Sequence, residues 1–345
     1  MLSILKLRIC VVALFSILFY DVESQEKLFD SDSVLKIDIV TDLKKLFRDV
    51  NPDKATYHQG LITYIDKNGS VVKIDAKFKT RGIFRRSKEN CNLPPISIKF
   101  CEDDVNNTIF KEIDKIKLVN SCNRRRDVFK QYLVKEYLAY KLYNLLTNYS
   151  FKVRLVYISY IDINNSISPF ESLGFFIEDM KSLNGRTKSS NVKTLGITQE
   201  AVDWRKMDVT AVFQYMIGNT DWSVPKLHNI KLVVGSSSYT PIAIPYDFDF
   251  CGFVNPPYTK PPDIIPIRHV TIRYYRGFCR TIDELMPILQ VFHDNKESIY
   301  RVISTDTLLN EKHKKAILMY IDEFYFTLSN NKLIEREFID NCRTE

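Results

Sequence analysis

Glycine-rich phosphate-binding loops are missing from this chain, which has only 10 glycines in 345 residues. No GxG occurs, and neither does the GxxxxGK(S/T) pattern in which backbone N–H groups cradle phosphates. A GxSxG nucleophile elbow and an HExxH zinc pair are also absent. The familiar nucleotide-binding signatures are therefore lacking, and the common serine hydrolases and zincins are disfavoured.

Membrane-spanning runs are lacking after the N-terminal segment. That segment places Lys6 and Arg8 before the apolar run 9–20 and the residues VESQ after it, which is the order of a secretory signal peptide. The run is shorter than the roughly twenty apolar residues of a spanning helix. We predict that residues 1–24 are a signal peptide, with an uncleaved anchor as the alternative. The mature protein is then secreted or periplasmic, without stable membrane insertion.

Zinc-ligand spacing is absent as well, because no CxxC or Cys/His cluster occurs. The predicted signal peptide contains Cys10, and an even number of cysteines follows it, as in oxidised exported proteins. We therefore predict disulfide bonds, with fifteen pairings open and one local bridge expected among the first three. The cysteines concerned are Cys91, Cys101, Cys122, Cys251, Cys279 and Cys342.

The composition is that of a globular protein, with 45% hydrophobic residues, 19 tyrosines and 22 phenylalanines. The net charge of +7 could attract phosphate-rich or acidic partners, although most of it is expected on solvated surface. No nucleic-acid-binding motif is present, so we predict no nucleic-acid partner.

The first half of the chain reads as a mostly antiparallel sheet with one main helix. Alternating segments flank Asn68-Gly69, which predicts a hairpin. A helical pattern covers 127–147 with Asp127 at its N-cap. The strands are expected at 61–66, 71–79, 94–100, 115–120, 151–162 and 173–179.

The second half is mostly helical in pattern. Its one clear strand pair is 228–234 with 240–248, and five prolines in 254–266 predict an extended loop. Helices are expected at 198–217, 281–292 and 310–328. We predict an α+β, bilobal chain with a sheet-rich N-terminal lobe at 25–178 and a helix-rich C-terminal lobe at 179–345.

Two carboxylates follow the apolar strand that ends in YDFDF. In a strand Asp247 and Asp249 project to the same side, and two such carboxylates repel each other unless a cation lies between them. Oxygen ligands of this kind suit Mg²⁺ or Mn²⁺. The alternative is a strand end with two solvated acids.

The segment GNTDWSVPKLHNIKL brings further polar side chains toward the same place. Closure of the strand pair brings Asn229 near Asp247, and an amide oxygen beside a carboxylate suits a divalent ion. Asp221 is then free to accept a proton from an attacking hydroxyl. A strand-edge amide for Asn229 and a structural role for His228 are the alternatives.

Glu136 lies on the apolar face of the helix at 127–147, so its carboxylate requires a partner. We expect that partner to be Lys99 in the strand ISIKF. Pairing with a nearby arginine such as Arg126, or with a tyrosine hydroxyl, is the alternative.

Together these residues resemble the layout of protein kinases, in which a strand lysine, a helix glutamate, a catalytic aspartate, a metal-binding asparagine and a metal-binding aspartate follow in that order. More closely, the chain resembles the spore-coat CotH-type kinase family, through the RG of KTRGIFRR, the strand PPISIKF, NTD…HNIKL and PYDFDFCG. The resemblance covers about residues 75–280 and is strongest in the last two motifs.

The resemblance implies a kinase-like fold that binds ATP between two lobes and transfers its γ-phosphoryl group to a serine or threonine hydroxyl of a secreted or envelope protein. It implies that Lys99 holds the phosphates, Glu136 orients Lys99, and Asp221 is the catalytic base. The remaining implied roles are Mg²⁺ or Mn²⁺ binding by Asn229 and Asp247, with Asp249 as an extra ligand, and phosphate binding by Arg81 beside Gly82.

The sequence departs from the kinase pattern in two places. Asp221 and Asn229 are eight residues apart, whereas the kinase catalytic loop separates them by five. The DFG element reads DFDFCG. Two alternative functions therefore stand beside the kinase: an inactive kinase-like module that binds an extracellular protein or glycan, and phosphoryl transfer to a sugar hydroxyl.

Overall fold

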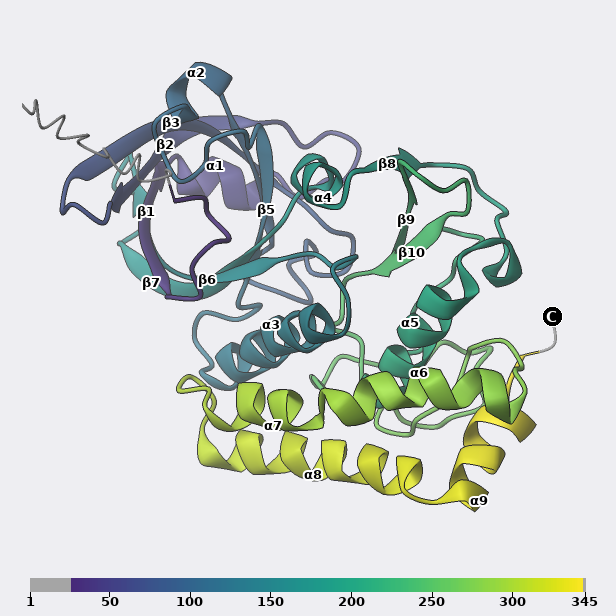
Figure 1. The fold of residues 1–345 in the computed structure, drawn as a ribbon. Coiled ribbons are helices and arrows are strands. Elements are labelled where there is room, and N and C mark those ends of the chain that lie inside the picture. Colours follow the sequence, from purple (N-terminus) through teal and green to yellow (C-terminus); the bar gives the residue numbers. More distant parts are fainter. Residues whose placement is uncertain (1–25, 344–345) are drawn as a thin grey trace, which may run out of the picture.

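The chain folds into a closed β-barrel followed by a mostly helical part (Figure 1). The computed structural model describes residues 26–343, so the predicted signal peptide at 1–24 lies outside the described residues. We call residues 26–178 the barrel part and residues 179–343 the helical part. The α+β class and the order of a sheet-rich half before a helix-rich half agree with the sequence prediction.

Seven strands close the barrel in the order β1-β2-β3-β4-β5-β7-β6. Closure depends on β1, which pairs antiparallel with β2 and parallel with β6. The predicted antiparallel sheet is thus a closed barrel, which the sequence did not indicate because the pairing of Leu35 with Val156 joins distant segments that local patterns do not connect. The strands are β1 Leu35–Thr41, β2 His58–Ile65, β3 Val71–Thr80, β4 Ile96–Phe100, β5 Lys115–Asn120, β6 Val153–Asp162 and β7 Phe170–Ile177.

The β2–β3 hairpin forms as predicted. Gly69 has φ +80° and its N–H donates to the carbonyl of Asp66 at 3.0 Å, which closes the turn. Along β3 the apolar residues Ile74, Ala76 and Phe78 point into the barrel and are buried. The period-two pattern thus determines which face of this strand lies in the barrel core.

Three helices accompany the barrel: α1 Leu43–Arg48, α2 Glu102–Val105 and α3 Val128–Leu146. The last is the predicted main helix, and Asp127 stands at its N-cap without a side-chain capping hydrogen bond. Buried residues of α3, such as Tyr140, share one hydrophobic core with Phe213 and Phe248 of the helical part. Helix α3 therefore joins the two parts (Figure 1).

The helical part contains the three predicted helices, α5, α6 and α8, and three that the sequence patterns did not predict, α4, α7 and α9. Helix α5 ends at Gly218, whose φ of +64° and close approach to the hydroxyl of Tyr320 leave no room for a side chain. Helices α6, α7 and α8 lie below α3 and α5 in Figure 1. The elements are α4 Met180–Thr187, β8 Ser189–Val192, α5 Trp204–Ile217, β9 Ile230–Gly235, β10 Ile242–Pro245, α6 Ile282–Asp294, α7 Lys296–Ser304, α8 Glu311–Leu328 and α9 Asn331–Ile334.

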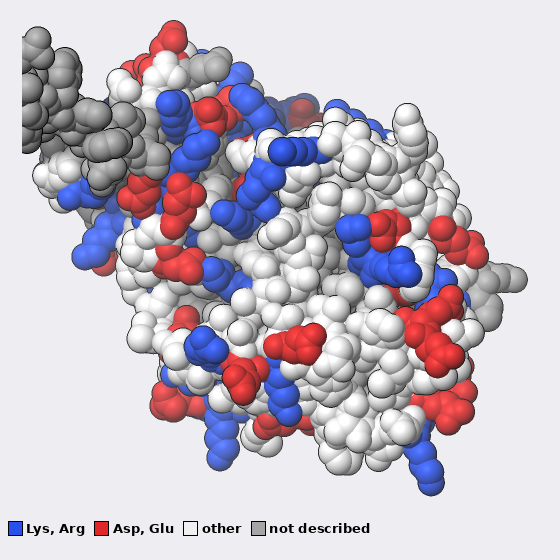
Figure 2. All heavy atoms as spheres, in the orientation of Figure 1, with Lys and Arg blue, Asp and Glu red and all other residues white. Residues whose placement is uncertain are grey.

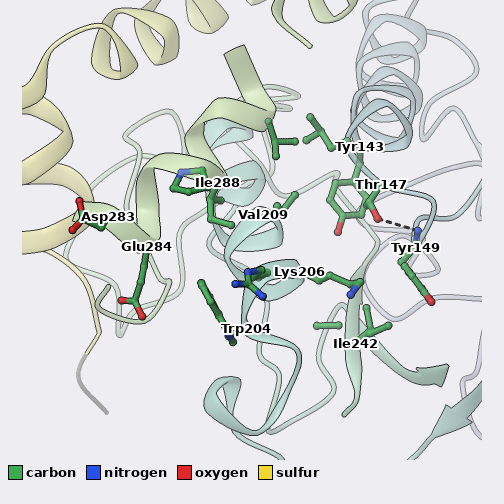
Figure 3. A pocket seen from close by; sticks show the side chains of 15 residues that line it. Tyr143, Thr147, Tyr149, Trp204, Lys206, Val209, Ile242, Asp283, Glu284 and Ile288 are labelled. Atoms are coloured by element: carbon green, nitrogen blue, oxygen red, sulfur yellow. Dashed lines mark hydrogen bonds between the residues drawn. The ribbon is translucent and has the colours of Figure 1, made fainter. Parts of the chain in front are cut away.

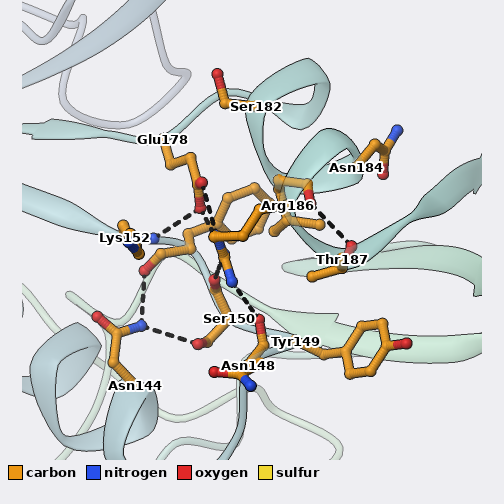
Figure 4. A network of polar contacts seen from close by, with 12 residues as sticks. Asn144, Asn148, Tyr149, Ser150, Lys152, Glu178, Ser182, Asn184, Arg186 and Thr187 are labelled. Carbon is orange, nitrogen blue, oxygen red and sulfur yellow. Dashed lines mark hydrogen bonds and ion pairs between the residues drawn. The ribbon is translucent and has the colours of Figure 1, made fainter. Parts of the chain in front are cut away.

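A polar network fixes the connection between the two parts (Figure 4). Arg186 of α4 donates from Nε and Nη2 to the two carboxylate oxygens of Glu178 at 3.1 and 2.8 Å. The same guanidinium donates to the carbonyls of Asn148 and Ser150, each at 2.7 Å. Since Glu178 is buried and directly follows β7, this bidentate pair anchors α4 against the end of the barrel.

The surface carries charges of both signs. On the face shown in Figure 2, lysine and arginine side chains lie among aspartates and glutamates over both parts. Between residues 26 and 343, no helix combines the length and the apolar character needed to cross a membrane.

Two disulfides form within residues 26–343, Cys91 to Cys122 and Cys279 to Cys342. The first is the predicted local bridge. The expectation that all six cysteines are paired is wrong, because Cys101 is exposed and Cys251 is buried, and neither has a sulfur partner in the described part of the chain.

Replacement of Cys279 and Cys342 by serine is expected to lower the free energy of unfolding by about 2–4 kcal/mol, since this bond closes a long loop of the unfolded chain. The two residues are 63 positions apart. Urea denaturation under oxidising conditions measures the effect, with Cys101→Ser as the matched control that should leave stability unchanged. Equal midpoints for the two variants would contradict the prediction.

Candidate active site

The candidate site lies where the loop after α5 meets the end of the β9–β10 hairpin. In this hairpin Ile230 pairs with Pro245, and the N–H of Tyr246 donates to the carbonyl of Asn229 at 3.0 Å. Asn229 is therefore held beside the segment that continues into Asp247. The structure brings these two predicted residues together by strand pairing, as the sequence suggested.

Residues 219–222 are fixed by side chains that face the interior. Asn219 donates from Nδ2 to the Gln214 side chain at 3.0 Å and accepts from the N–H of Asp221 at 2.9 Å. The indole of Trp222 is buried and donates to the carbonyl of Asn219 at 3.1 Å. The backbone that carries Asp221 is thus held in place, and Asn219 has a structural role.

The unusual spacing between Asp221 and Asn229 is absorbed by a small turn. Ser223 and His228 exchange backbone hydrogen bonds of 2.9 and 3.0 Å, so the residues between them loop out. Nδ2 of Asn229 still donates to Oδ2 of Asp221 at 3.0 Å, and His228 Nε2 lies 2.8 Å from Oδ1. The two residues are neighbours in space despite the longer loop.

Backbone strain is concentrated at this site. Leu227, Asn229 and Asp247 have φ values of +48°, +51° and +65°, in the left-handed region that residues other than glycine seldom adopt. Such residues persist where surrounding contacts fix them, often at functional sites. For Asp247 one such contact is the hydroxyl of Tyr140, which accepts from its N–H at 2.8 Å.

The left-handed backbone at Asp247 also changes the predicted geometry of YDFDF. The strand ends at Pro245, so Asp247 and Asp249 do not alternate along a strand as expected. Asp247 is exposed and Asp249 is buried, yet an oxygen of each lies within 4.8 Å of the other and of an oxygen of Glu136. The two carboxylates converge through a turn of the backbone, whereas Phe248 enters the core.

Glu136 is buried, as predicted, but its partner is Arg85. Nη2 of Arg85 lies 2.5 Å from Oε2 of Glu136 and 2.8 Å from Oδ2 of Asp249. Nε of Arg85 donates to the same Asp249 oxygen at 2.9 Å. The predicted ion pair between Lys99 and Glu136 is therefore wrong.

Lys99 lies elsewhere, exposed on the outside of β4 between Lys77 of β3 and Lys115 of β5. The period-two pattern of a strand does not show which of its outward-facing residues points toward a neighbouring helix. The alternative of a nearby arginine agrees with the pairing to Arg85, although Arg126, the example given, lies over the ring of Phe129 at 5.3 Å.

Sequence reasoning missed a cluster of cations around Tyr246. The ammonium groups of Lys117 on β5 and Lys231 on β9 lie 5.2 and 5.1 Å from the centre of its ring. Arg81, which a positive-φ Gly82 follows, is close enough to act electrostatically on both Lys117 and Tyr246. The sequence signal that could have indicated Lys117 is its strand, KIKLVN, which is the last strand before the helix that carries Glu136.

Burial shifts the protonation of several of these groups. Burial, followed by the nearby Arg81, lowers the pKa of Lys117 to about 8, while Asp247 acts in the opposite direction. Burial also raises the pKa values of Glu136 and Asp249, and the charge of Arg85 opposes that rise in both. Arg85 is thus the main group that opposes the neutralisation of these two neighbouring buried carboxylates.

The oxygen donors fit a divalent cation. Oε1 of Glu136 is buried and lacks a hydrogen-bond partner, and the carboxylate of Asp247 accepts no hydrogen bond from residues 26–343. Because Asn229 uses its amide nitrogen toward Asp221, its amide oxygen stays available. Carboxylate and amide oxygens are the ligands that Mg²⁺ and Mn²⁺ prefer.

A pocket of about 640 Å³ lies away from these carboxylates (Figure 3). Its walls come from the end of α3, the start of α5, β10 and the start of α6, and they are largely apolar, for example Tyr143, Ile242 and Ile288. Glu284 at its rim caps α6 through Thr281. The carboxylates at Asp221 and Asp247, away from this pocket, remain the candidate site.

Substitution of Arg85 by alanine is expected to lower the free energy of unfolding by about 3–5 kcal/mol, because it leaves two buried carboxylates without their counter-ion. Urea denaturation measures the loss, and Lys99→Ala, on an exposed strand face, should change stability by about 0.5 kcal/mol at most. Adding Glu136→Gln to the Arg85 variant should restore part of the lost stability. A loss below about 1 kcal/mol for Arg85→Ala would show that the ion pairs are not important for the fold.

No family model matches the chain, and no curated protein matches it. Among solved structures, the crystal structure of a Helicobacter pylori proinflammatory kinase, CtkA, matches over 74% of this chain and 95% of that chain. The identity is 12% and the TM-score is 0.37. Likeness at this level does not establish what the chain does.

Proposed function

We propose that the chain is a metal-dependent, kinase-like phosphotransferase of the CotH type, which transfers the γ-phosphoryl group of ATP to a serine or threonine hydroxyl. The observation that carries the proposal is the convergence of Asp221, Asn229 and Asp247, with Asn229 contacting Asp221 at 3.0 Å and flanking the segment that leads to Asp247. In kinases an aspartate accepts the hydroxyl proton while an asparagine and a second aspartate hold the metal.

Asp221 is the proposed base. Its side chain is about 30% exposed, so an acceptor hydroxyl can reach it, while His228 and Asn229 orient its two oxygens. A base within hydrogen-bond reach of the attacking hydroxyl is the geometric requirement for this role.

Asn229 and Asp247 are the proposed ligands of Mg²⁺ or Mn²⁺, with Asp249 as an additional ligand through the oxygen that Arg85 does not use. When bound, the ion would neutralise charge on the donor phosphates. Lys117 takes the phosphate-binding role that the resemblance implied for Lys99. It lies on the strand before α3, and its ammonium group interacts electrostatically with Asp247.

The proposed place of action is outside the cytoplasm, on a secreted or envelope protein. Two disulfides support an oxidising compartment. An inactive binding module remains the second candidate, and the observation that favours it is the engagement of both Glu136 and Asp249 by Arg85, which leaves Lys117 without the helix glutamate as partner.

Asp221→Asn is expected to reduce the release or transfer of the ATP γ-phosphate by about 10²–10⁴-fold, because the base is lost while the donor site is intact. Asp247→Ala should in addition abolish the Mg²⁺-dependent rise in melting temperature on ATP addition. Radiolabelled ATP and thermal melts measure the two effects on the oxidised protein.

Lys99→Met is the control and should behave as the unaltered protein. Transfer at the unaltered rate by Asp221→Asn would exclude the assigned base. A folded, unaltered protein with no Mg²⁺-dependent ATP binding would favour the binding module.

A further inference from the structure

Two lysines from separate elements lie against one tyrosine ring, and an arginine acts electrostatically on the same group. Lys117 comes from β5 and Lys231 from β9 of the helical part, and Arg81 directly follows β3. Both ammonium groups lie just over 5 Å from the centre of the Tyr246 ring, at 5.2 and 5.1 Å. The cluster therefore bridges the barrel part and the helical part.

The cations of this cluster form no ion pairs within residues 26–343. Lys117, Lys231 and Arg81 are all partly buried. The nearby Asp247 attracts Lys117, whereas Arg81, Lys231 and Lys115 repel it. Partly buried like charges are stabilised when an anion binds between them.

We propose that Arg81, Lys117 and Lys231 form a single anion site for a chain of linked phosphate groups, with Lys231 as the phosphate-binding residue of the helical part. The proposal rests on the proposed function only in identifying the phosphate chain as that of the nucleotide donor. The tyrosine ring holds both ammonium groups by cation–π contacts and so positions them before the anion arrives.

Lys231 has a position that supports this role. It is two residues after Asn229, and its backbone pairs with Ile244, two residues before Tyr246. The phosphate chain would therefore lie next to Asn229 and Asp247, where the metal ligands are proposed. An anion held by lysines of both parts would also stabilise their contact.

Binding of inorganic tripolyphosphate, measured by calorimetry in the presence of EDTA, tests the site without a metal and without turnover. The unaltered protein should bind, and Lys117→Met, Lys231→Met and Arg81→Ala should each weaken binding about tenfold or more, since each removes a charge-assisted contact. Lys99→Met removes the same charge from an exposed strand face and should leave the affinity unchanged. Lys231→Arg, which keeps the charge, should retain binding if Lys231→Met does not fold.

A Lys231→Met titration that superimposes on that of the unaltered protein would overturn the proposal, as would an equal loss for Lys99→Met. Tighter binding of ATP than of tripolyphosphate would assign the phosphate chain to a nucleotide, and equal binding would assign it to a free polyphosphate; both support the site. Tripolyphosphate binding without any phosphoryl transfer from ATP would contradict the proposed function and leave the anion site intact. If Lys231→Met changes neither phosphoryl transfer nor the affinity for tripolyphosphate, the anion site is contradicted and the proposed function stands.

Discussion

The site depends on one buried guanidinium. Arg85 reaches from the segment between β3 and β4 to Glu136 of α3 and to Asp249 of the helical part. Without this charge two carboxylates would lie together in the interior, where desolvation and mutual repulsion both favour their neutral forms. The Cys91–Cys122 disulfide attaches the same segment to the residues before α3, and Phe84 packs against Phe250 and Tyr258. The arginine is thus held by contacts on both sides, and it sets the distance between the barrel and the carboxylates.

Much of the local structure could be predicted because it depends on local patterns. The hairpin at Gly69, the helix that contains Glu136 and the pairing of β9 with β10 each follow from periodicity and turn residues within a few positions. The neighbourhood of Asn229 and Asp247 followed in turn, since strand pairing alone determines it. Closure of the barrel could not be predicted, because β1 and β6 pair over more than a hundred residues.

The charged partners in the site were harder to predict for a similar reason. The position of Glu136 on the apolar face of a helix showed that its carboxylate needs a counter-ion. The sequence did not show which residue supplies that counter-ion. Arg85 lies in an irregular segment with no period to indicate its direction, whereas Lys99 lies in a regular strand and was the more visible candidate. The register of β4 and β5 then placed Lys99 beside Lys115 on the outer surface, two positions from Lys117.

The position of Arg85 explains why Lys117 can stay unpaired. In the kinase layout one lysine serves both the helix glutamate and the phosphates. Here the guanidinium of Arg85 pairs with Glu136, so the charge of Lys117 stays available for a ligand. Burial without an ion-pair partner lowers the pKa of Lys117. Such a division is stable only if the unpaired lysine has another favourable contact, and the ring of Tyr246 supplies it to Lys117 and Lys231 together. Tyr246, which contacts the two lysines, directly precedes Asp247, the proposed metal ligand. A shift of one of these residues therefore shifts the other. Any ligand that draws the lysines together therefore also acts on the position of the Asp247 carboxylate.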